Sequence, residues 1–193
     1  MDKIRCEWAN CHPLAKKYHD DEWGNPVHDD RIHFEYLFLE VMQCGLNWLT
    51  ILKKREAFRI NFDNFDFIKI SQYQIDKINT LMQNVDIIRS RKKIDAVIHN
   101  ANRYIEIRNE YGTFDNYLWS FTDNSVITVY EHSEGHVPSQ TALSDIISKD
   151  LKKRGFKFLG SITVYAHLQA AGLINDHYKE CFKFKELDES KRK

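Results

Sequence analysis

Glycine and proline are scarce in this chain, and their scarcity narrows the folds open to it. The sequence of 193 residues contains 7 Gly and 3 Pro, whereas a fold built from many short strands needs such residues at frequent turns. Apolar side chains recur three and four residues apart over long stretches, which is the spacing of an amphipathic helix. The sequence therefore predicts an all-α protein.

Residues 30–44 form the clearest predicted helix. An Asp precedes this stretch and Gly45 follows it, and these residue types are typical of a helix start and of the position after a helix end. The apolar residues in helical register are Phe34, Leu37, Phe38, Val41 and Met42. The same spacing predicts further helices over the segments 47–62, 72–82, 89–112, 141–155 and 158–172.

Two segments lack this spacing. Residues 122–140 carry Gly135 and Pro138, so we expect a loop there, with room for a short strand pair at 125–130. Residues 183–193 are mostly charged and are expected to fray. The remaining chain, 1–182, is expected to fold as a single unit.

The cellular compartment is predicted from what the sequence lacks. No apolar run approaches the roughly 20 residues of a membrane-spanning helix, and no apolar leader follows the first residues. We therefore expect a cytoplasmic protein with no membrane partner, whose 4 Cys are free thiols or metal ligands. The formal net charge is zero, which argues against a nucleic-acid partner, but Lys and Arg cluster at 89–93 and 149–157.

Cysteine and histidine lie near both ends of the chain. His177 and Cys181 are four residues apart, so on a helix they share one face. Cys6 precedes His19 in the N-terminal segment. Because structural zinc takes four Cys or His ligands, one Cys–His pair from each end would form a site that joins the termini. The alternative is that His177 and Cys181 are ordinary residues on a helix surface.

The ligand set is not unique from the pattern alone. Cys11 and His12 compete with Cys6 and His19, and spacing does not separate the two pairs. Cys44 lies in the apolar predicted helix and is expected to be a small core residue.

Glu40 stands on an apolar strip of the first predicted helix. Its neighbours three and four residues away include Leu37 and Cys44, and a carboxylate in such surroundings costs free energy unless it has a partner. Two interpretations follow from the residues: an internal ion pair with a distant Arg or Lys, or a functional carboxylate.

Five separated motifs give the chain a family resemblance. "RCEW", "YHDDEWG", "LEVMQCGLNW", "LKKRGFKFLG" and "LQAAGLINDH" together resemble the 3-methyladenine DNA glycosylase I family, a branch of the helix-hairpin-helix DNA glycosylases. The resemblance extends from Cys6 to Cys181. It implies the helix-hairpin-helix fold and a monofunctional enzyme of base excision repair, which flips 3-methyladenine out of alkylated DNA and hydrolyses its N-glycosidic bond.

The resemblance also implies partners and a cofactor. The partners are double-stranded DNA that carries alkylated bases and, as product, free 3-methyladenine. A monomer is expected, since the sequence has no coiled-coil heptad repeat. One structural Zn²⁺ per chain is implied, with the ligands Cys6, His19, His177 and Cys181.

The resemblance assigns roles in the base pocket. Glu40 is implied to contact the flipped base and to be the catalytic residue. Trp48 is implied to stack on the base, with Tyr18 and Trp8 as further walls. Without the resemblance, these three aromatic residues would be interpreted as core packing.

DNA contacts are implied for two segments. Gly45 and Leu46 are candidates to enter the gap that the flipped base leaves, and "LKKRGFKFLG" resembles the hairpin that holds a phosphate. The hairpin residues expected to contact DNA are Lys153, Arg154, Gly155, Lys157 and Gly160. Some hairpin glycosylases use a Lys nucleophile, but the family that this chain resembles is monofunctional, so Lys157 is assigned to a phosphate.

The sequence departs from the family pattern at three positions. Asn47 stands where Ser is common, Ala15 where an aromatic residue is common, and Asp86 where Gly is usual. These departures leave the outer pocket wall and a local turn in question. Two rival functions are a non-catalytic zinc-containing DNA-binding domain and a zinc hydrolase of small molecules, which requires an open metal position.

Overall fold

The structure is a computed structural model that describes residues 3–130 and 137–189. Its α-helices are α1 (Pro13–Asp21), α2 (Asp30–Gln43), α3 (Trp48–Asn61), α4 (Phe67–Ser71), α5 (Ile75–Gln83), α6 (Arg91–Tyr111), α7 (Phe114–Trp119), α8 (Ala142–Lys153), α9 (Ser161–Ala170) and α10 (Phe182–Glu189). Short 3-10 helices are η1 (Glu7–Cys11), η2 (Asp63–Phe65) and η3 (Ser120–Thr122), and the two strands are β1 (Ile127–Thr128) and β2 (Ile174–Asn175). The predicted all-α class is confirmed.

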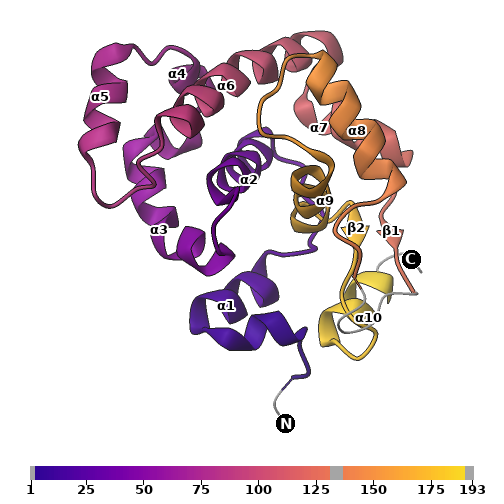
Figure 1. The fold of residues 1–193 in the computed structure, drawn as a ribbon. Helices are drawn as coiled ribbons and strands as arrows, with labels where there is room; N and C mark the ends of the chain where they lie inside the picture. Colours follow the sequence, from indigo (N-terminus) through magenta and orange to yellow (C-terminus); the bar gives the residue numbers. More distant parts are fainter. Residues whose placement is uncertain (1–2, 131–136, 190–193) are drawn as a thin grey trace.

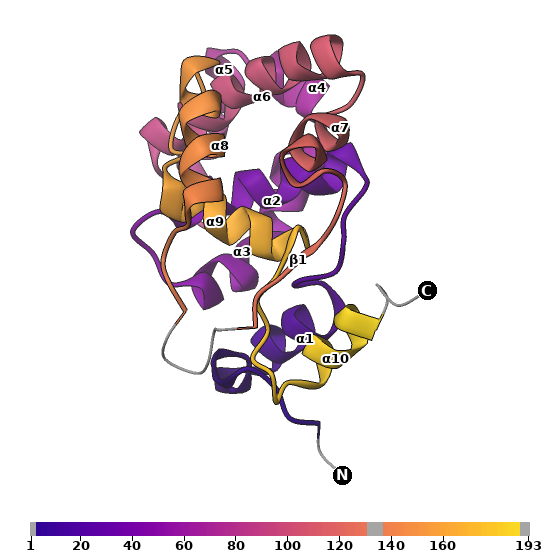
Figure 2. The same ribbon diagram turned by 90° about the vertical axis from the view of Figure 1, so that its right-hand side faces the viewer.

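The helices form a large body and a smaller layer beneath it. In Figure 1, α2 and α9 lie at the centre of the body, with α3, α6 and α8 around them. Figure 2 shows α1 and α10 together below this body, next to both chain ends. The backbone N–H of Phe182 donates to the carbonyl of Ile4 at 2.9 Å, so the first and last described segments are directly joined. We call this part, residues 3–23 and 176–189, the terminal layer.

Helix α2 is the central element of the body. The side chain of Asp29 accepts hydrogen bonds from the backbone N–H groups of Arg31 and Ile32, which satisfies two donors at the helix start. All five apolar residues that define its predicted register are buried. All residues from 33 to 42 are buried, so α2 is covered around nearly its whole circumference. Its predicted bounds agree with the structure to within one residue.

The strand prediction was wrong in its pairing. Residues 125–130 do not form a strand pair with each other; β1 pairs in parallel with β2. The N–H of Ile127 donates to Leu173 at 2.9 Å, and the N–H of Val129 donates to Asn175 at 3.1 Å. The partner lies more than forty residues away along the chain, so no local pattern reveals it. Gly135, on which the loop prediction partly rested, lies outside the described residues.

The C-terminal segment also differs from the expectation. Residues 182–189 form α10, whereas a frayed tail was expected from 183 onward. Phe184 is buried, and its burial together with the bond from Phe182 to Ile4 holds a segment whose composition is mostly charged. Residues 190–193 lie outside the described part. Within the described ranges, none of the helices has the length and apolarity that crossing a bilayer demands.

Helix α9 contains a histidine, His167, whose ring is buried in the core. Both ring nitrogens of His167 are buried without a hydrogen-bond partner among the described residues, and this burial holds the pKa of His167 well below its ordinary value. The unfolded chain therefore binds a proton near pH 6 that the folded chain does not, so stability falls as the pH drops below about 6.5.

We expect His167→Leu to stabilise the protein, by about 1–2 kcal/mol near pH 7 and by more at pH 5. The physical reason is the removal of two unpartnered polar atoms from the core and, at acid pH, of a site that only the unfolded chain protonates. Urea unfolding of both proteins at pH 5 and 7.5 measures this difference. An identical pH dependence in the two proteins would contradict it.

Candidate functional site

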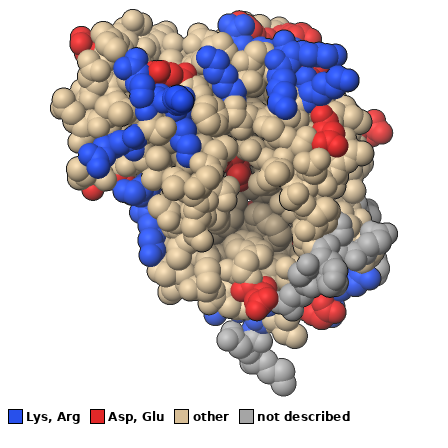
Figure 3. Space-filling view, in the orientation of Figure 1, with Lys and Arg blue, Asp and Glu red and all other residues tan. Residues whose placement is uncertain are grey.

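A cavity of about 340 Å³ opens between the terminal layer and the helical body. Figure 3 shows a hollow on the face that is turned to the viewer in Figure 1. The cavity is lined by Trp8, Tyr18, Trp23, Glu40, Gln43, Trp48, Val137, Ala166, Gln169, Asp176 and Tyr178. The four residues predicted for the base pocket, Glu40, Tyr18, Trp48 and Trp8, therefore line one cavity.

Glu40 is a buried carboxylate without a partner. It is 5% exposed, and among residues 3–130 and 137–189 no side chain pairs with its carboxyl group. Burial alone raises the pKa of Glu40 to about 8. The arginines of α3 pair with another carboxylate, since Arg55 and Arg59 contact Glu35 at 2.7 and 2.8 Å. The structure therefore shows no internal ion pair for Glu40, and its carboxyl group lines the cavity.

Aromatic rings form the walls beside this carboxyl group. The ring centroids of Tyr18 and Trp48 are 5.3 Å apart, and those of Trp8 and Tyr18 are 6.3 Å apart. Trp23 extends the row, at 5.1 Å from Trp8. Tyr18 is buried, whereas Trp8 and Trp48 are partly exposed, so these indoles face a space rather than a filled core.

Sequence reasoning missed several lining residues. Trp23 stands in the same "YHDDEWG" motif as Tyr18, five residues after it, and this shared motif was a usable signal. Asp176 stands in the "LQAAGLINDH" motif, but its role depends on contacts with α9: it accepts hydrogen bonds from the hydroxyl of Tyr165 and the amide of Gln169, both at 2.6 Å. The cavity thus contains one carboxylate engaged in hydrogen bonds and one, Glu40, without a partner.

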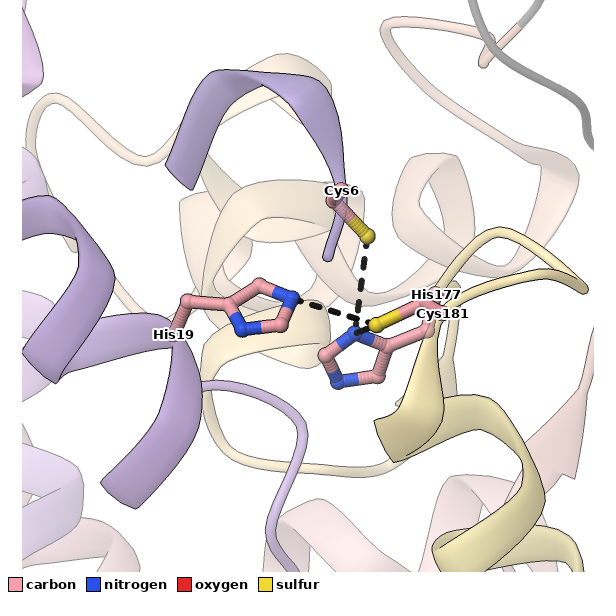
Figure 4. A group of neighbouring side chains, drawn as sticks. All are labelled: Cys6, His19, His177 and Cys181. Carbon is pink, nitrogen blue, oxygen red and sulfur yellow. Dashed lines mark hydrogen bonds between the residues drawn. The ribbon is translucent and has the colours of Figure 1, made fainter. Parts of the chain in front are cut away.

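Cys6, His19, His177 and Cys181 converge within the terminal layer (Figure 4). Their four ligand atoms lie within 4.8 Å of one another, and all four residues are buried. Nε2 of His19 is 3.4 Å from Sγ of Cys181, and Nδ1 of His177 is 3.6 Å from each sulfur. Ligands at 2.0–2.3 Å from a tetrahedral ion stand roughly 3.5 Å apart, so the cluster can hold a metal ion.

In His19 and His177, the ring nitrogen that does not face the cluster contacts an oxygen atom, as is usual for histidine ligands of metal ions. Nδ1 of His19 is 2.9 Å from the carboxylate of Asp20, which in turn accepts two parallel bonds from Arg5. Nε2 of His177 is 3.3 Å from the carbonyl of Trp23. Such outer contacts fix the tautomer that directs the remaining nitrogen to the ion. The hydrogen bond between the two thiols lowers the pKa of Cys181 and raises that of Cys6.

The structure also shows which of the competing ligand candidates belong to the cluster. Cys11 is exposed, and the His12 side chain accepts a bond from the N–H of Leu14 as the cap of α1. Cys44 is half-buried at the end of α2 rather than in the core. These residues lie outside the cluster, which leaves one Cys–His pair from each end of the chain.

His177 and Cys181 do not lie on a helix, contrary to the assumption behind their spacing. They belong to the turns between β2 and α10, where the N–H of Cys181 donates to the carbonyl of Tyr178 at 2.8 Å. Gly24 makes room for them, since it has φ +81° and a Cβ there would lie 2.7 Å from Nε2 of His177. The final residue of "YHDDEWG" is therefore a packing requirement of the cluster.

Two turns carry the predicted DNA contacts, and the first of them begins at Gln43, which lines the cavity. The first, residues 43–46, is closed by a bond from the N–H of Leu46 to the carbonyl of Gln43 at 2.6 Å. Gly45 has φ +76°, as the third residue of a type II turn requires. Leu46 is 41% exposed. We call this the wedge turn.

The second turn, residues 154–160, is the hairpin between α8 and α9. Gly155 has φ +90°, and Gly160 precedes α9 with open space beside its Cα. Lys153 and Lys157 are exposed. Arg154 pairs with Glu110 at 2.6 Å and Asp150 at 2.7 Å, so its charge ties α8 to α6, and its contact with DNA stays a prediction.

The three departures from the family pattern have local explanations. The Asn47 side chain accepts from the N–H of Leu49 at 2.8 Å, so it caps α3 as a Ser can. Ala15 is buried in a small cluster with Tyr18 and does not line the cavity. Asp86 is not among the described residues with positive φ, so its turn does not need Gly, and its carbonyl accepts from Lys54 at 3.0 Å.

Basic side chains gather on the same side of the molecule. Figure 3 shows Lys and Arg on the left-hand side and along the top of the face that carries the hollow, with other residues between them and the hollow itself. Exposed residues on α3, α6 and α8 include Lys53, Arg91, Lys92, Lys152 and Lys153. A chain with zero net charge can therefore present a local positive field on the face that carries the cavity.

Comparisons with known proteins agree with this site. A family model described as methyladenine glycosylase matches residues 8–184. DNA-3-methyladenine glycosylase 1 of Escherichia coli (strain K12) is 42% identical over 177 residues, which cover 92% of this chain and 95% of that protein. The DNA-3-methyladenine glycosylase of Haemophilus influenzae is 40% identical over 92% of this chain and 96% of its own length.

Solved structures show the same architecture. A crystal structure of 3-methyladenine DNA glycosylase I has a TM-score of 0.89 at 44% identity, covering 93% of this chain and 98% of that chain. A variant of 3-methyladenine DNA glycosylase I in complex with 3-methyladenine has a TM-score of 0.87 at 38% identity, with 92% and 96% covered. These matches confirm the predicted resemblance and fold class. The chain belongs to the methyladenine glycosylase family.

Proposed function

We propose that this protein is a monofunctional DNA glycosylase that flips 3-methyladenine out of alkylated double-stranded DNA and hydrolyses its N-glycosidic bond. The observation that carries the proposal is the unpartnered carboxyl group of Glu40 inside an aromatic cavity. Relatives at 42% and 40% identity are named for this activity. The reaction releases free 3-methyladenine as part of base excision repair.

The cavity fits a cationic base better than a neutral one. Alkylation at N3 places positive charge on adenine, and a desolvated indole face attracts a cation by ~2 kcal/mol or more. The pKa of Glu40 near 8 means that the empty site holds this carboxyl group mostly protonated at neutral pH. A positively charged base offsets the cost of ionising it, whereas normal adenine does not. Specificity then follows from charge as well as from shape.

The chemical step needs little assistance from the protein. When the bond between C1′ and N9 breaks, its electron pair stays on the base and neutralises the cation. The sugar develops positive charge and takes up water, which then loses a proton. Trp48 and Trp8 hold the base by stacking, and the carboxylate of Glu40 accepts hydrogen bonds from its exocyclic amine. Binding energy therefore acts mainly by orienting a base that is already primed to leave.

We further propose that the ion in the terminal layer is Zn²⁺ with a structural role. Two thiols and two imidazoles are the donor set that zinc takes at closed tetrahedral sites. Four protein ligands leave no position for a bound water, which argues against a zinc hydrolase of small molecules. Zinc supplies cross-linking between the chain ends, while the chemistry of the base takes place in the adjacent cavity.

Base release tests the proposed function. Methylated duplex DNA is incubated with the protein, and the released bases are identified by chromatography. Free 3-methyladenine is expected, without release of adenine from unmodified DNA. A non-catalytic DNA-binding domain would bind the duplex and release no base, and that outcome would refute the proposal.

We expect Lys157 not to form a covalent intermediate. Its side chain is exposed on the hairpin rather than in the cavity, so its ammonium is available for a phosphate and not for C1′. Borohydride added during the reaction should trap no protein–DNA adduct, while base release proceeds. An adduct that Lys157→Met abolishes would show that the enzyme uses a lysine nucleophile after all.

A further inference from the structure

The wedge turn and the hairpin are both held by α6, a helix that does not line the cavity. The two turns lie next to each other, since Sγ of Cys44 is 3.9 Å from the carbonyl oxygen of Phe158. Each turn receives a buried polar side chain from α6. These side chains are Lys93 and Asn100.

Lys93 binds the end of α2. Its ammonium donates to the carbonyl oxygens of Met42 and Cys44, both at 2.7 Å. The last carbonyls of a helix have no partner within it, and a cation at this end is favourable. Lys93 thus fixes the residues through which α2, the helix that carries Glu40, enters the wedge turn.

The burial of Lys93 shows that this contact is a specific one. The residue is 8% exposed, and within the described ranges no carboxylate forms an ion pair with it. Burial lowers the pKa of Lys93. Placing an ammonium in such surroundings is costly, and the two carbonyls are what compensates for it here.

Asn100 binds the hairpin in a comparable way. It is 6% exposed; its amide donates to the carbonyl of Lys157 at 2.9 Å and accepts from the N–H of Lys157 at 2.8 Å. Lys93 and Asn100 are seven residues apart, so they share one face of α6. One helix face therefore contacts both turns.

The backbone of the hairpin shows that its shape is imposed from outside. Phe158, next to Lys157, has φ +62°, which is an outlier for a bulky side chain. Such a conformation persists only where the surroundings determine it. The paired bonds from Asn100 are directly adjacent to this strained residue.

We propose that Lys93 and Asn100 are positioning residues that hold the wedge turn and the hairpin at a fixed separation on the DNA. This inference rests on the proposed glycosylase function. Neither side chain lines the cavity, so neither contacts the base. Their effect is exerted while the duplex is opened, when Leu46 must enter the gap as the hairpin holds the backbone.

The test compares excision from DNA with binding of the free base. Lys93→Met keeps the length of the side chain and removes its donors, and Asn100→Leu removes both bonds to Lys157. We expect each variant to excise 3-methyladenine from duplex DNA about 10- to 100-fold more slowly in single-turnover reactions, because small misplacements have effects of this size. Affinity for free 3-methyladenine, followed by tryptophan fluorescence, should stay within about twofold of wild type, since both side chains lie outside the cavity. Lys69→Met, which removes an exposed lysine of α4, is the matched control.

A second substrate separates positioning from general damage to the fold. The alkylated strand is annealed either to its complement or to a strand with an abasic site opposite the lesion. Opening costs less free energy without the opposing base, so the deficit of both variants should shrink on the second substrate. A damaged fold would slow both reactions equally.

The outcomes are distinguishable. If the wild-type protein releases no base, the proposed function fails. If it does, and the variants match its rate, lose free-base affinity in proportion, or show the same deficit on both substrates, the positioning role is refuted. Should Lys93→Met fail to fold, Asn100→Leu decides the question by the same criteria.

Discussion

Glu40→Gln lowers the rate of 3-methyladenine excision by about a hundredfold or more, at an unchanged fold. The amide keeps the size of the side chain but cannot carry the negative charge that balances a cationic base. Removing one preorganised electrostatic partner from a dry site has effects of about 10²–10³ on rate. Single-turnover excision from alkylated duplex DNA measures this loss.

The control for this variant is Glu56→Gln. Glu56 is an exposed carboxylate of α3, with 69% of its side chain accessible, and it lies outside the cavity. The Glu56→Gln variant should excise 3-methyladenine at the wild-type rate. Undiminished excision by both variants would remove Glu40 from the site and with it the central argument for the enzyme.

Glu40→Gln, which is expected to lower the rate of excision, is expected to raise the free energy of unfolding. The pKa of Glu40 is raised from 4.5 to about 8 by burial, so between these values the folded protein holds a proton that the unfolded chain releases. Stability contributed by this group is therefore lost as the pH rises from about 4.5 to 8. Glu40→Gln should be more stable than wild type at pH 8 by up to a few kcal/mol, and nearly equal to it at pH 4.5. Urea unfolding at both pH values tests this, and a pH-independent difference would contradict the buried, unpartnered carboxyl group.

Local sequence patterns were sufficient to predict most of the helices. The bounds of α2 follow from Asp29 and Gly45, which act through the backbone of their immediate neighbours. Gly112, the glycine that ends the predicted helix 89–112, has φ +83° and follows α6 directly, as is typical of a residue after a helix end. Signals of this kind are short-range, so a single sequence contains them in full.

Features that depend on distant contacts were not predictable in this way. The pairing of β1 with β2 and the ion pair of Arg154 with Glu110 each join segments that are far apart along the chain. The short helices η1, α4 and α7 span too few turns to show a clear period. Asp176 was missed although it lines the cavity, because its hydrogen bonds to Tyr165 and Gln169 form only once the chain has folded.

The candidate site itself was predictable only because of the family resemblance. Spacing alone left Cys11 and His12 as rivals, and chemistry alone left Glu40 between an ion pair and a functional role. The structure brings Cys6 and His19 to His177 and Cys181 and leaves Glu40 without a partner.

Cys181→Ser, or removal of the metal by a chelator, is expected to lower the melting temperature by about 10 °C or more. Structural zinc sites contribute many kcal/mol to folding, and in a protein of this size each kcal/mol shifts the midpoint by about 2–4 °C. Metal analysis should find one zinc ion per wild-type chain and a reduced content in Cys181→Ser. Cys11→Ser, which changes an exposed thiol outside the cluster, should leave both quantities unchanged.

Metal loss should damage the pocket before it unfolds the helical body. Trp23 lines the cavity and packs against His177 with ring centroids 4.5 Å apart, and Tyr18 directly precedes His19. The main core, by contrast, is built around α2, α6 and α9 and does not include the four ligands. We therefore expect the chelated protein to retain most of its helical circular dichroism while its affinity for free 3-methyladenine falls. Unchanged affinity and melting temperature after complete chelation would show that the terminal layer is held by its own packing and that the metal does not shape the pocket.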